Sequence, residues 1–162
     1  AMRYLAKSRA VRTNFVVHRQ FWAGVPDASE AGKEAMLAAR LAYVRNLMDS
    51  DFVLCVRGSG NFSYRLYEAL CCGRIPVFVN TDCVLPYDFA VGWRRHCVWV
   101  EGAELPAIAT QVERFHRQLS PDGYQELQRS CRSLWEEWLS PHGFFRNFHR
   151  HFETTGIAGG SR

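Results

Sequence analysis

Short apolar runs that alternate with helix-like segments constrain the fold of this chain more than any other feature. Continuous apolar runs rich in β-branched and aromatic residues are typical of strands that are covered on both faces. Strand alternating with helix is the pattern of a doubly wound parallel α/β sheet. Four runs are predicted to be strands, at residues 14–18, 52–56, 75–79 and 97–100.

Helical patterns fill the gaps between these runs. Within residues 29–48, apolar residues at Leu37, Leu41, Val44 and Met48 recur at spacings of four, three and four, which predicts a helix with one apolar face. A shorter helix is predicted over residues 63–72. Its start signal is Asn61 or Ser63, and Gly73 is its stop signal.

The last third of the chain is predicted to be a helical cluster that packs on or beside the sheet. Pro106 fits the first turn of one helix, and the dipeptides Ser120-Pro121 and Ser140-Pro141 carry the same start signal for two more. We predict one Rossmann-like domain over residues 1–155. The Gly/Ser-rich residues 156–162 are predicted to form a flexible tail.

Composition excludes several classes of protein. With 162 residues the chain suits one domain, and 48% hydrophobic residues exclude intrinsic disorder. A net charge of +4 is too small to indicate a nucleic-acid partner. No apolar run approaches the ~20 residues of a membrane-spanning helix. No C-x-x-C pair and no histidine spacing typical of zinc ligands is present, so no metal is expected.

The segment from residue 52 to residue 70 carries the residues that most strongly indicate a ligand-binding site. A predicted strand runs through a glycine-rich loop, which contains Gly58, directly into a predicted helix. The first N–H groups of a helix and its dipole favour an anion such as phosphate. Arg57 and Arg65 add guanidinium donors suited to phosphate, and the carboxylate of Glu68 can accept from sugar hydroxyls.

Other interpretations of the same segment stay open. The glycines also suit a simple tight turn, and Arg65 with Glu68 also suits a solvated surface pair. The spacing Gly58-x-Gly60-x-x-Ser63 resembles the dinucleotide fingerprint with Asp82 further on, but the third glycine is missing. A dinucleotide-binding Rossmann domain is therefore the least favoured interpretation of this segment.

Residues 50–88 also resemble the signature of the exostosin-like glycosyltransferases. The agreement runs through residues 50–55, 57–58, 63–70, 73–77 and 84–87, and continues more weakly through residues 93, 98–100 and 134–136. The resemblance implies a GT-B glycosyltransferase made of two Rossmann-like halves, with the donor nucleotide held by the carboxyl-terminal half. This chain resembles that half.

The resemblance also implies a role for particular residues. Arg57 and Arg65 would contact the diphosphate of a nucleotide-sugar, Gly58 and Ser63 would support that loop, and Glu68 would bind the ribose. Members of the family transfer the sugar with inversion to a glycan or glycoconjugate acceptor. A UDP-sugar is the favoured donor, no cofactor is implied, and no residue is assigned as the catalytic base.

The length of the chain is compatible with two interpretations of its function. An enzyme with both halves needs roughly twice this length, so an acceptor-binding half or a partner chain is expected beside this one. The first reading is the donor-binding part of an enzyme, and the alternative is a non-catalytic nucleotide- or glycan-binding module that supports a partner transferase. The lack of a signal segment favours a cytoplasmic location, with membrane association left open, and the Golgi lumen is the alternative for a eukaryotic member.

Overall fold

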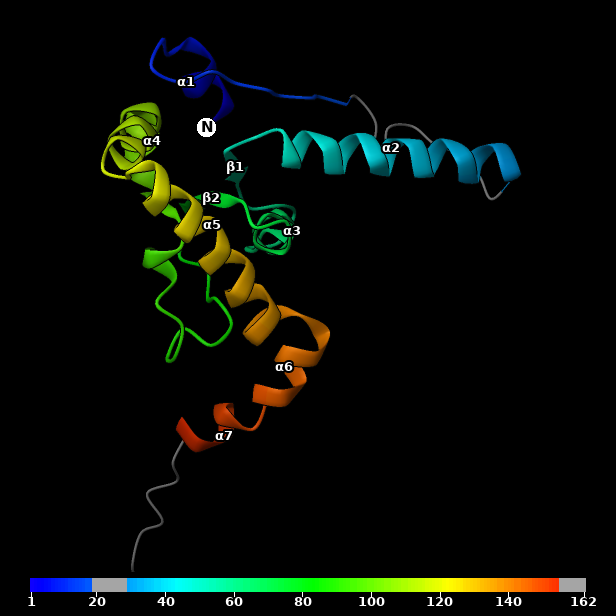
Figure 1. Cartoon of the computed structure of the whole chain (residues 1–162), viewed down its shortest axis with the longest axis vertical. Coiled ribbons are helices and arrows are strands. Elements are labelled where there is room, and N and C mark those ends of the chain that lie inside the picture. Colours follow the sequence, from blue (N-terminus) through cyan, green and yellow to red (C-terminus); the bar gives the residue numbers. More distant parts are fainter. Residues whose placement is uncertain (19–28, 155–162) are drawn as a thin grey trace, which may run out of the picture.

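The computed structural model describes residues 1–18 and 29–154, so the predicted tail at 156–162 lies outside the described residues (Figure 1). The helices are α1 (Met2–Lys7), α2 (Glu30–Met48), α3 (Tyr64–Cys71), α4 (Ile108–Arg117), α5 (Pro121–Leu134), α6 (Pro141–Asn147) and α7 (Arg150–Thr154). The strands are β1 (Phe52–Cys55), β2 (Ile75–Asn80) and β3 (Val98–Glu101). Two 3-10 helices (Trp93–Arg95, Gly102–Ala107) and a π-helix (Trp135–Leu139) complete the described elements.

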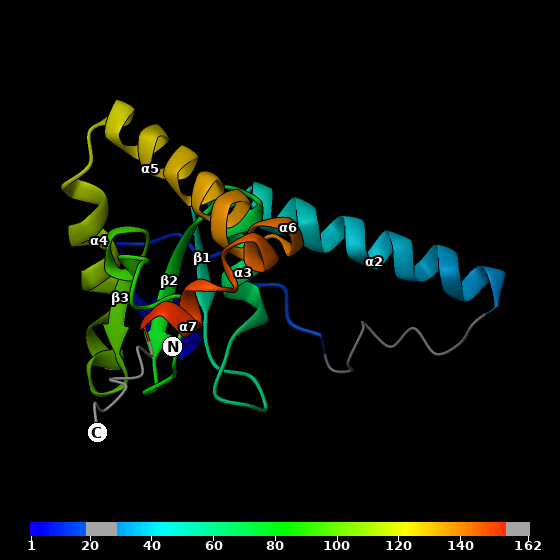
Figure 2. The ribbon, with the colours of Figure 1, turned by 90° about the horizontal axis from the view of Figure 1, so that it is seen from below.

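The three strands form one parallel sheet in the order β1-β2-β3. Phe52 of β1 pairs with Ile75 of β2, and Val77 of β2 pairs with Val98 of β3. Helices alternate with these strands and a helical cluster follows them, as Figure 2 shows. The predicted α/β class with a parallel sheet and a C-terminal helical cluster is confirmed, and three of the four predicted strands are present.

Helices cover both faces of the sheet. On one face, α3 and α5 pack over Val53, Cys55 and Phe78. On the other face, α1 and α4 pack over a second cluster that includes Val77 and Val79. Because successive side chains of a strand point to opposite faces, the wholly buried β2 must be apolar at consecutive positions, as its sequence is.

The predicted strand at residues 14–18 is wrong, because the structure gives this segment no regular secondary structure. Val16 and Val17 are 60% and 73% exposed. The carbonyl oxygen of Asn14 accepts a hydrogen bond from Nδ2 of Asn46 on α2, at 3.0 Å. A strand needs a neighbouring strand for its backbone groups, and this segment lies instead beside a helix.

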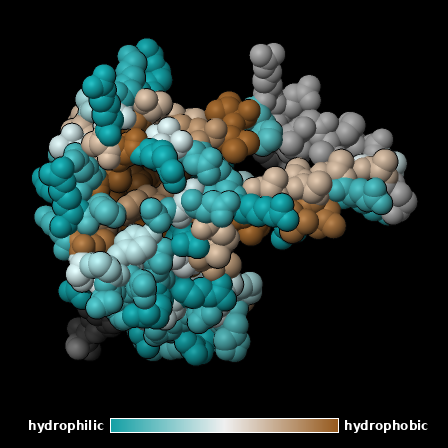
Figure 3. Space-filling model, turned by 45° about the horizontal axis from the view of Figure 1, so that its top comes forward, coloured by the Kyte–Doolittle hydropathy of each residue, from teal (hydrophilic) through white to brown (hydrophobic). Residues whose placement is uncertain are grey.

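Helix α2 has the predicted limits but not a buried apolar face. It begins after Ser29, whose Oγ accepts from the backbone N–H of Gly32 at 3.1 Å. Figure 1 shows α2 projecting from the body of the molecule, and Figure 3 shows apolar side chains along it. Its predicted apolar stripe is exposed, whereas Leu47, near its last turn, joins the core.

The stop and start signals of the other helices act largely as predicted. Gly73 follows α3 with a φ of 61°, a left-handed conformation that glycine adopts without strain. Ser120 and Ser140 each accept a hydrogen bond from the N–H three residues on, at 3.1 and 3.0 Å. Pro106 lies in the 3-10 helix before α4 rather than in α4 itself. The predicted last helix is divided into α6 and α7.

Candidate functional site

The loops that follow β1 and β2 meet at the carboxyl edge of the sheet. Nδ2 of Asn61 donates to the carbonyl oxygen of Thr81 at 2.9 Å, and Oγ1 of Thr81 donates to Oδ1 of Asn61 at 2.6 Å. This reciprocal pair ties the glycine-rich loop to its neighbour. Ligands of open parallel α/β sheets bind at this edge, so the pair supports the surface on which the predicted site residues lie.

The glycine-rich loop is tightly closed on itself. The N–H of Gly58 donates to the carbonyl oxygen of Phe62 at 3.0 Å. A Cβ at Gly60 would lie 2.6 Å from Cε1 of Phe62, so the ring packs where a side chain would stand. Packing of the Phe62 ring within the turn therefore explains why residue 60 is a glycine. A Cβ at Gly58 would meet only the Phe62 oxygen, at 3.8 Å, so this residue leaves open space beside the loop.

Ser63 stands at the N-cap position of α3, but its hydroxyl makes no capping bond. The residue is 6% exposed, and its Oγ has no hydrogen-bond partner within the described part of the chain. Asn61, the other predicted cap, bonds to Thr81 instead. A buried hydroxyl without a partner costs about 1–3 kcal/mol. The start of α3 thus retains an unused polar group beside its free N–H groups.

The three charged residues of the predicted site are exposed, and the structure brings two of them together. Arg65 and Glu68 lie in the first two turns of α3 and share a contact with Tyr43 of α2. Both also act electrostatically on the thiol of Cys55, the last residue of β1, whose pKa burial raises far above its usual range. Arg57 makes no hydrogen bond or ion pair with the described residues.

The contact with Tyr43 is the feature of this site that sequence reasoning missed. Its hydroxyl donates to Oε2 of Glu68 and accepts from Nε of Arg65 at 3.2 Å. The guanidinium of Arg65 also lies over the Tyr43 ring, 5.4 Å from its centroid. Tyr43 is 25 residues before Glu68, on a different helix, so no local pattern points to this pairing.

A second polar cluster lies at the carboxyl ends of β2 and β3. Glu101, which directly follows the predicted fourth strand, accepts from Nδ2 of Asn80, from a terminal nitrogen of Arg94 and from Nε1 of Trp99, each at 2.7 Å. These hydrogen bonds hold the pKa of Glu101 below its usual value, and the bond from Asn80 has the largest effect. The guanidinium of Arg94 lies 4.4 Å from the Trp99 ring centroid. Glu101 is therefore a fixed anion at this edge.

Replacing Glu101 by glutamine is expected to lower stability in a pH-dependent way. Because the carboxyl pKa is lower in the folded protein, the carboxylate stabilises the fold above the usual value of 4.5, and this contribution is lost as pH falls through the folded-state value. Urea unfolding of wild type and Glu101→Gln should differ at about pH 7, and the difference should shrink as the pH falls below 4.5 and the Glu101 carboxylate becomes protonated. A matched control is Glu126→Gln, which removes a carboxylate paired with Arg129; a similar pH dependence in both variants would contradict the prediction.

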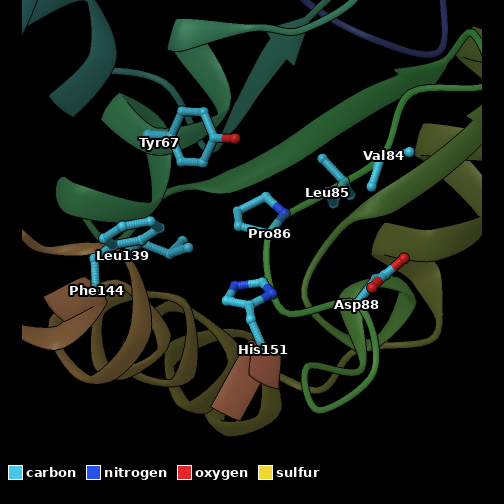
Figure 4. A pocket seen from close by; sticks show the side chains of 8 residues that line it. All are labelled: Tyr67, Val84, Leu85, Pro86, Asp88, Leu139, Phe144 and His151. Atoms are coloured by element: carbon cyan, nitrogen blue, oxygen red, sulfur yellow. The ribbon is translucent and has the colours of Figure 1, made fainter. Parts of the chain in front are cut away.

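A hollow of about 520 Å³ lies between the loop after β2 and the C-terminal helices (Figure 4). Its lining comprises Tyr67, Val84, Leu85, Pro86, Asp88, Leu139, Phe144 and His151. None of the five predicted site residues lines it. The predicted site is thus an exposed surface of the β1 loop and α3, and not this hollow.

Neither a metal cluster nor a membrane-spanning helix occurs in residues 1–18 and 29–154. No group of three or more histidine, cysteine, aspartate or glutamate residues in these ranges is placed to hold an ion. None of the helices there combines the length and apolarity needed to cross a bilayer.

Fold and site together define a parallel α/β protein with its polar loops gathered at the carboxyl edge of the sheet. The exostosin GT47 domain model matches residues 7–115 of this sequence. The chain therefore belongs to the exostosin GT47 family of glycosyltransferases, which confirms the resemblance drawn from residues 50–88.

Curated relatives agree with this membership. Exostosin-1 of Drosophila melanogaster is 29% identical over 100 residues, which cover 62% of this chain and 13% of that protein. A probable glucuronosyltransferase of Oryza sativa subsp. japonica is 37% identical over 68 residues, and a probable beta-1,4-xylosyltransferase of Arabidopsis thaliana is 35% identical over 68 residues. Each match to the two plant proteins covers 42% of this chain and 16% of the relative. The matched region thus spans about one seventh of the length of these relatives.

Proposed function

We propose that this chain is the donor-binding part of an inverting glycosyltransferase that transfers a sugar from a nucleoside-diphosphate sugar to a glycan acceptor. The observation that carries the proposal is the start of α3. There the space beside Gly58 is open, the hydroxyl of Ser63 is buried without a partner among the described residues, and Arg57 and Arg65 are exposed. Family membership supplies the reaction class, and these groups supply the reason to place the diphosphate at this end of the helix.

The electrostatics of the proposed site suit departure of a nucleoside diphosphate. As the bond to the sugar breaks, negative charge grows on the β-phosphate oxygens, and fixed donors stabilise that charge without reorganising. Two guanidinium groups and the N–H groups of α3 can supply this stabilisation. Glu68, one turn after Arg65, is suited to accept from the ribose hydroxyls. UDP is the favoured nucleotide.

The proposal is tested by calorimetric titration of the 162-residue chain with UDP, GDP, CMP and NAD. UDP is expected to bind, and Arg65→Ala and Glu68→Ala are each expected to weaken it at least about tenfold, which is about 1.4 kcal/mol. The matched control is Arg117→Ala, which removes an exposed arginine on α4 that pairs with Glu113. Preferred binding of NAD, or no binding of any nucleoside diphosphate to a chain folded by circular dichroism, would contradict the proposal.

A further inference from the structure

Tyr43 links helix α2 to the two charged residues of α3 that the proposed function assigns to the donor. Figures 1 and 2 show the C-terminal end of α2 close to α3, with the axes of the two helices at a steep angle to each other. Tyr43 is partly buried and packs against the main core cluster, next to Leu47, which is 4% exposed. Much of the rest of α2 is exposed. The C-terminal end of α2 is thus held against the core by Leu47, and Tyr43 lies in this same part of the helix, next to α3.

The hydroxyl of Tyr43 makes two different hydrogen bonds at once. It donates its proton to Oε2 of Glu68, and its oxygen accepts from Nε of Arg65 at 3.2 Å. A hydroxyl has one proton to donate and lone pairs to accept with, so both bonds form without competition. Its ring, 5.4 Å from the Arg65 guanidinium, further limits where that side chain lies. One residue therefore restrains both side chains.

These bonds leave the ligand-binding atoms of both side chains unused. Within the described part of the chain, Oε1 of Glu68 and the terminal nitrogens of Arg65 have no hydrogen-bond partner. The terminal nitrogens are the guanidinium donors best suited to phosphate, and one carboxylate oxygen is enough to accept from a sugar hydroxyl. Tyr43 thus uses Nε of Arg65 and one carboxylate oxygen of Glu68, and it leaves the terminal nitrogens and the other oxygen available to a ligand.

The protonation state of Tyr43 agrees with this arrangement. Burial, followed by the hydrogen bond to Glu68, raises the pKa of Tyr43 to about 12. The hydroxyl therefore keeps its proton near neutral pH and donates it to the carboxylate. A phenolate would instead repel Glu68 and would have no proton to donate to it.

We propose that Tyr43 is a positioning residue of the donor site: it fixes Glu68 so that one carboxylate oxygen is presented to the ribose hydroxyls, and fixes Arg65 for the diphosphate. The inference rests on the proposed function. It adds α2 to a site that the family signature places only on the β1 loop and α3. Tyr43 does not contact the ligand and acts through Glu68 and Arg65.

The test compares nucleotides with and without ribose hydroxyls. UDP and 2′,3′-dideoxy-UDP are titrated into wild type, Tyr43→Phe, Glu68→Gln and the double variant. Tyr43→Phe keeps the ring over Arg65 and removes only the hydroxyl. It is expected to weaken UDP about five- to tenfold but dideoxy-UDP by no more than about twofold, because Arg65 loses its bond to the hydroxyl and keeps the ring beneath its guanidinium. In the Glu68→Gln background, Tyr43→Phe should add less than about twofold, because the two groups act as a unit.

The test needs a control variant and separates three other outcomes. The control Tyr4→Phe removes the hydroxyl of an exposed tyrosine on α1 and should leave both affinities unchanged. If Tyr43→Phe weakens both nucleotides equally, the role of Tyr43 is structural and the inference is wrong. If Glu68→Gln weakens UDP but Tyr43→Phe does not, the inference fails while the proposed function stands. If wild type does not bind UDP, both are overturned.

Discussion

Replacing Tyr87 by alanine is expected to lower the free energy of unfolding by about 4 kcal/mol. Tyr87 is fully buried in the loop after β2. Its ring lies 5.3 Å from that of Trp138 and 5.6 Å from that of Phe144, measured between centroids. Its hydroxyl donates to the carbonyl oxygen of Phe144 at 2.6 Å. Alanine would leave a large cavity and an unpaired carbonyl.

Tyr87→Phe separates the two parts of this effect. It keeps the ring and removes only the hydrogen bond, so a loss of about 1.5 kcal/mol is expected. Urea unfolding followed by circular dichroism measures both variants. Equal losses for alanine and phenylalanine would show that ring packing contributes little and would contradict the prediction.

Tyr87 also explains why the C-terminal helices matter to the carboxyl edge of the sheet. Residues 81–92 form the loop after β2. Thr81 of this loop is hydrogen-bonded to Asn61 of the glycine-rich loop. Tyr87 fixes the middle of that loop to α6 and to the π-helix. The helical cluster therefore holds one side of the candidate site in place, although it supplies none of the predicted site residues.

The parts of the fold that could be predicted from sequence are those set by local patterns. The strands β1, β2 and β3 are covered on both faces, so their apolar continuity identifies them. The serine-proline starts and Gly73 act through their own backbone conformation and neighbouring N–H groups. Residues 14–18 carry the same apolar signal but have no strand beside them, and composition alone cannot supply that partner.

The candidate site could be predicted only where its residues are close together in the sequence. The loop and the start of α3 are contiguous, so the positions of Arg57, Gly58, Ser63, Arg65 and Glu68 near one strand end follow from sequence. The contacts of Tyr43 and the pair Asn61–Thr81 join segments 20 or more residues apart. They depend on how α2 and the neighbouring loop pack, which no spacing encodes. The roles assigned to the five residues stay predictions.

The second large effect is expected at Gly143, in the first turn of α6. A Cβ at this position would lie 2.5 Å from the carbonyl oxygen of Glu137 and 2.6 Å from that of Glu136. Both oxygens belong to the backbone of the π-helix, so they cannot rotate away as a side chain could. Nδ2 of Asn147 also bonds to the Glu137 oxygen at 2.8 Å, which holds α6 against it. Glycine is therefore needed for the close approach of these two helices.

Gly143→Ala is accordingly expected to lower the free energy of unfolding by about 3 kcal/mol, because the overlap with backbone atoms forces α6 outward. The chain offers a matched control in Gly123, which occupies the same place in a second Ser-Pro-x-Gly start. There a Cβ would meet the Ser120 Oγ at 3.2 Å and no backbone atom of another element within 4 Å. Alanine also gains about 1 kcal/mol of helix propensity over glycine, so Gly123→Ala should stay within about 1 kcal/mol of wild type. Equal losses in urea unfolding would mean that the shared motif, and not the contact with the π-helix, requires glycine at Gly143.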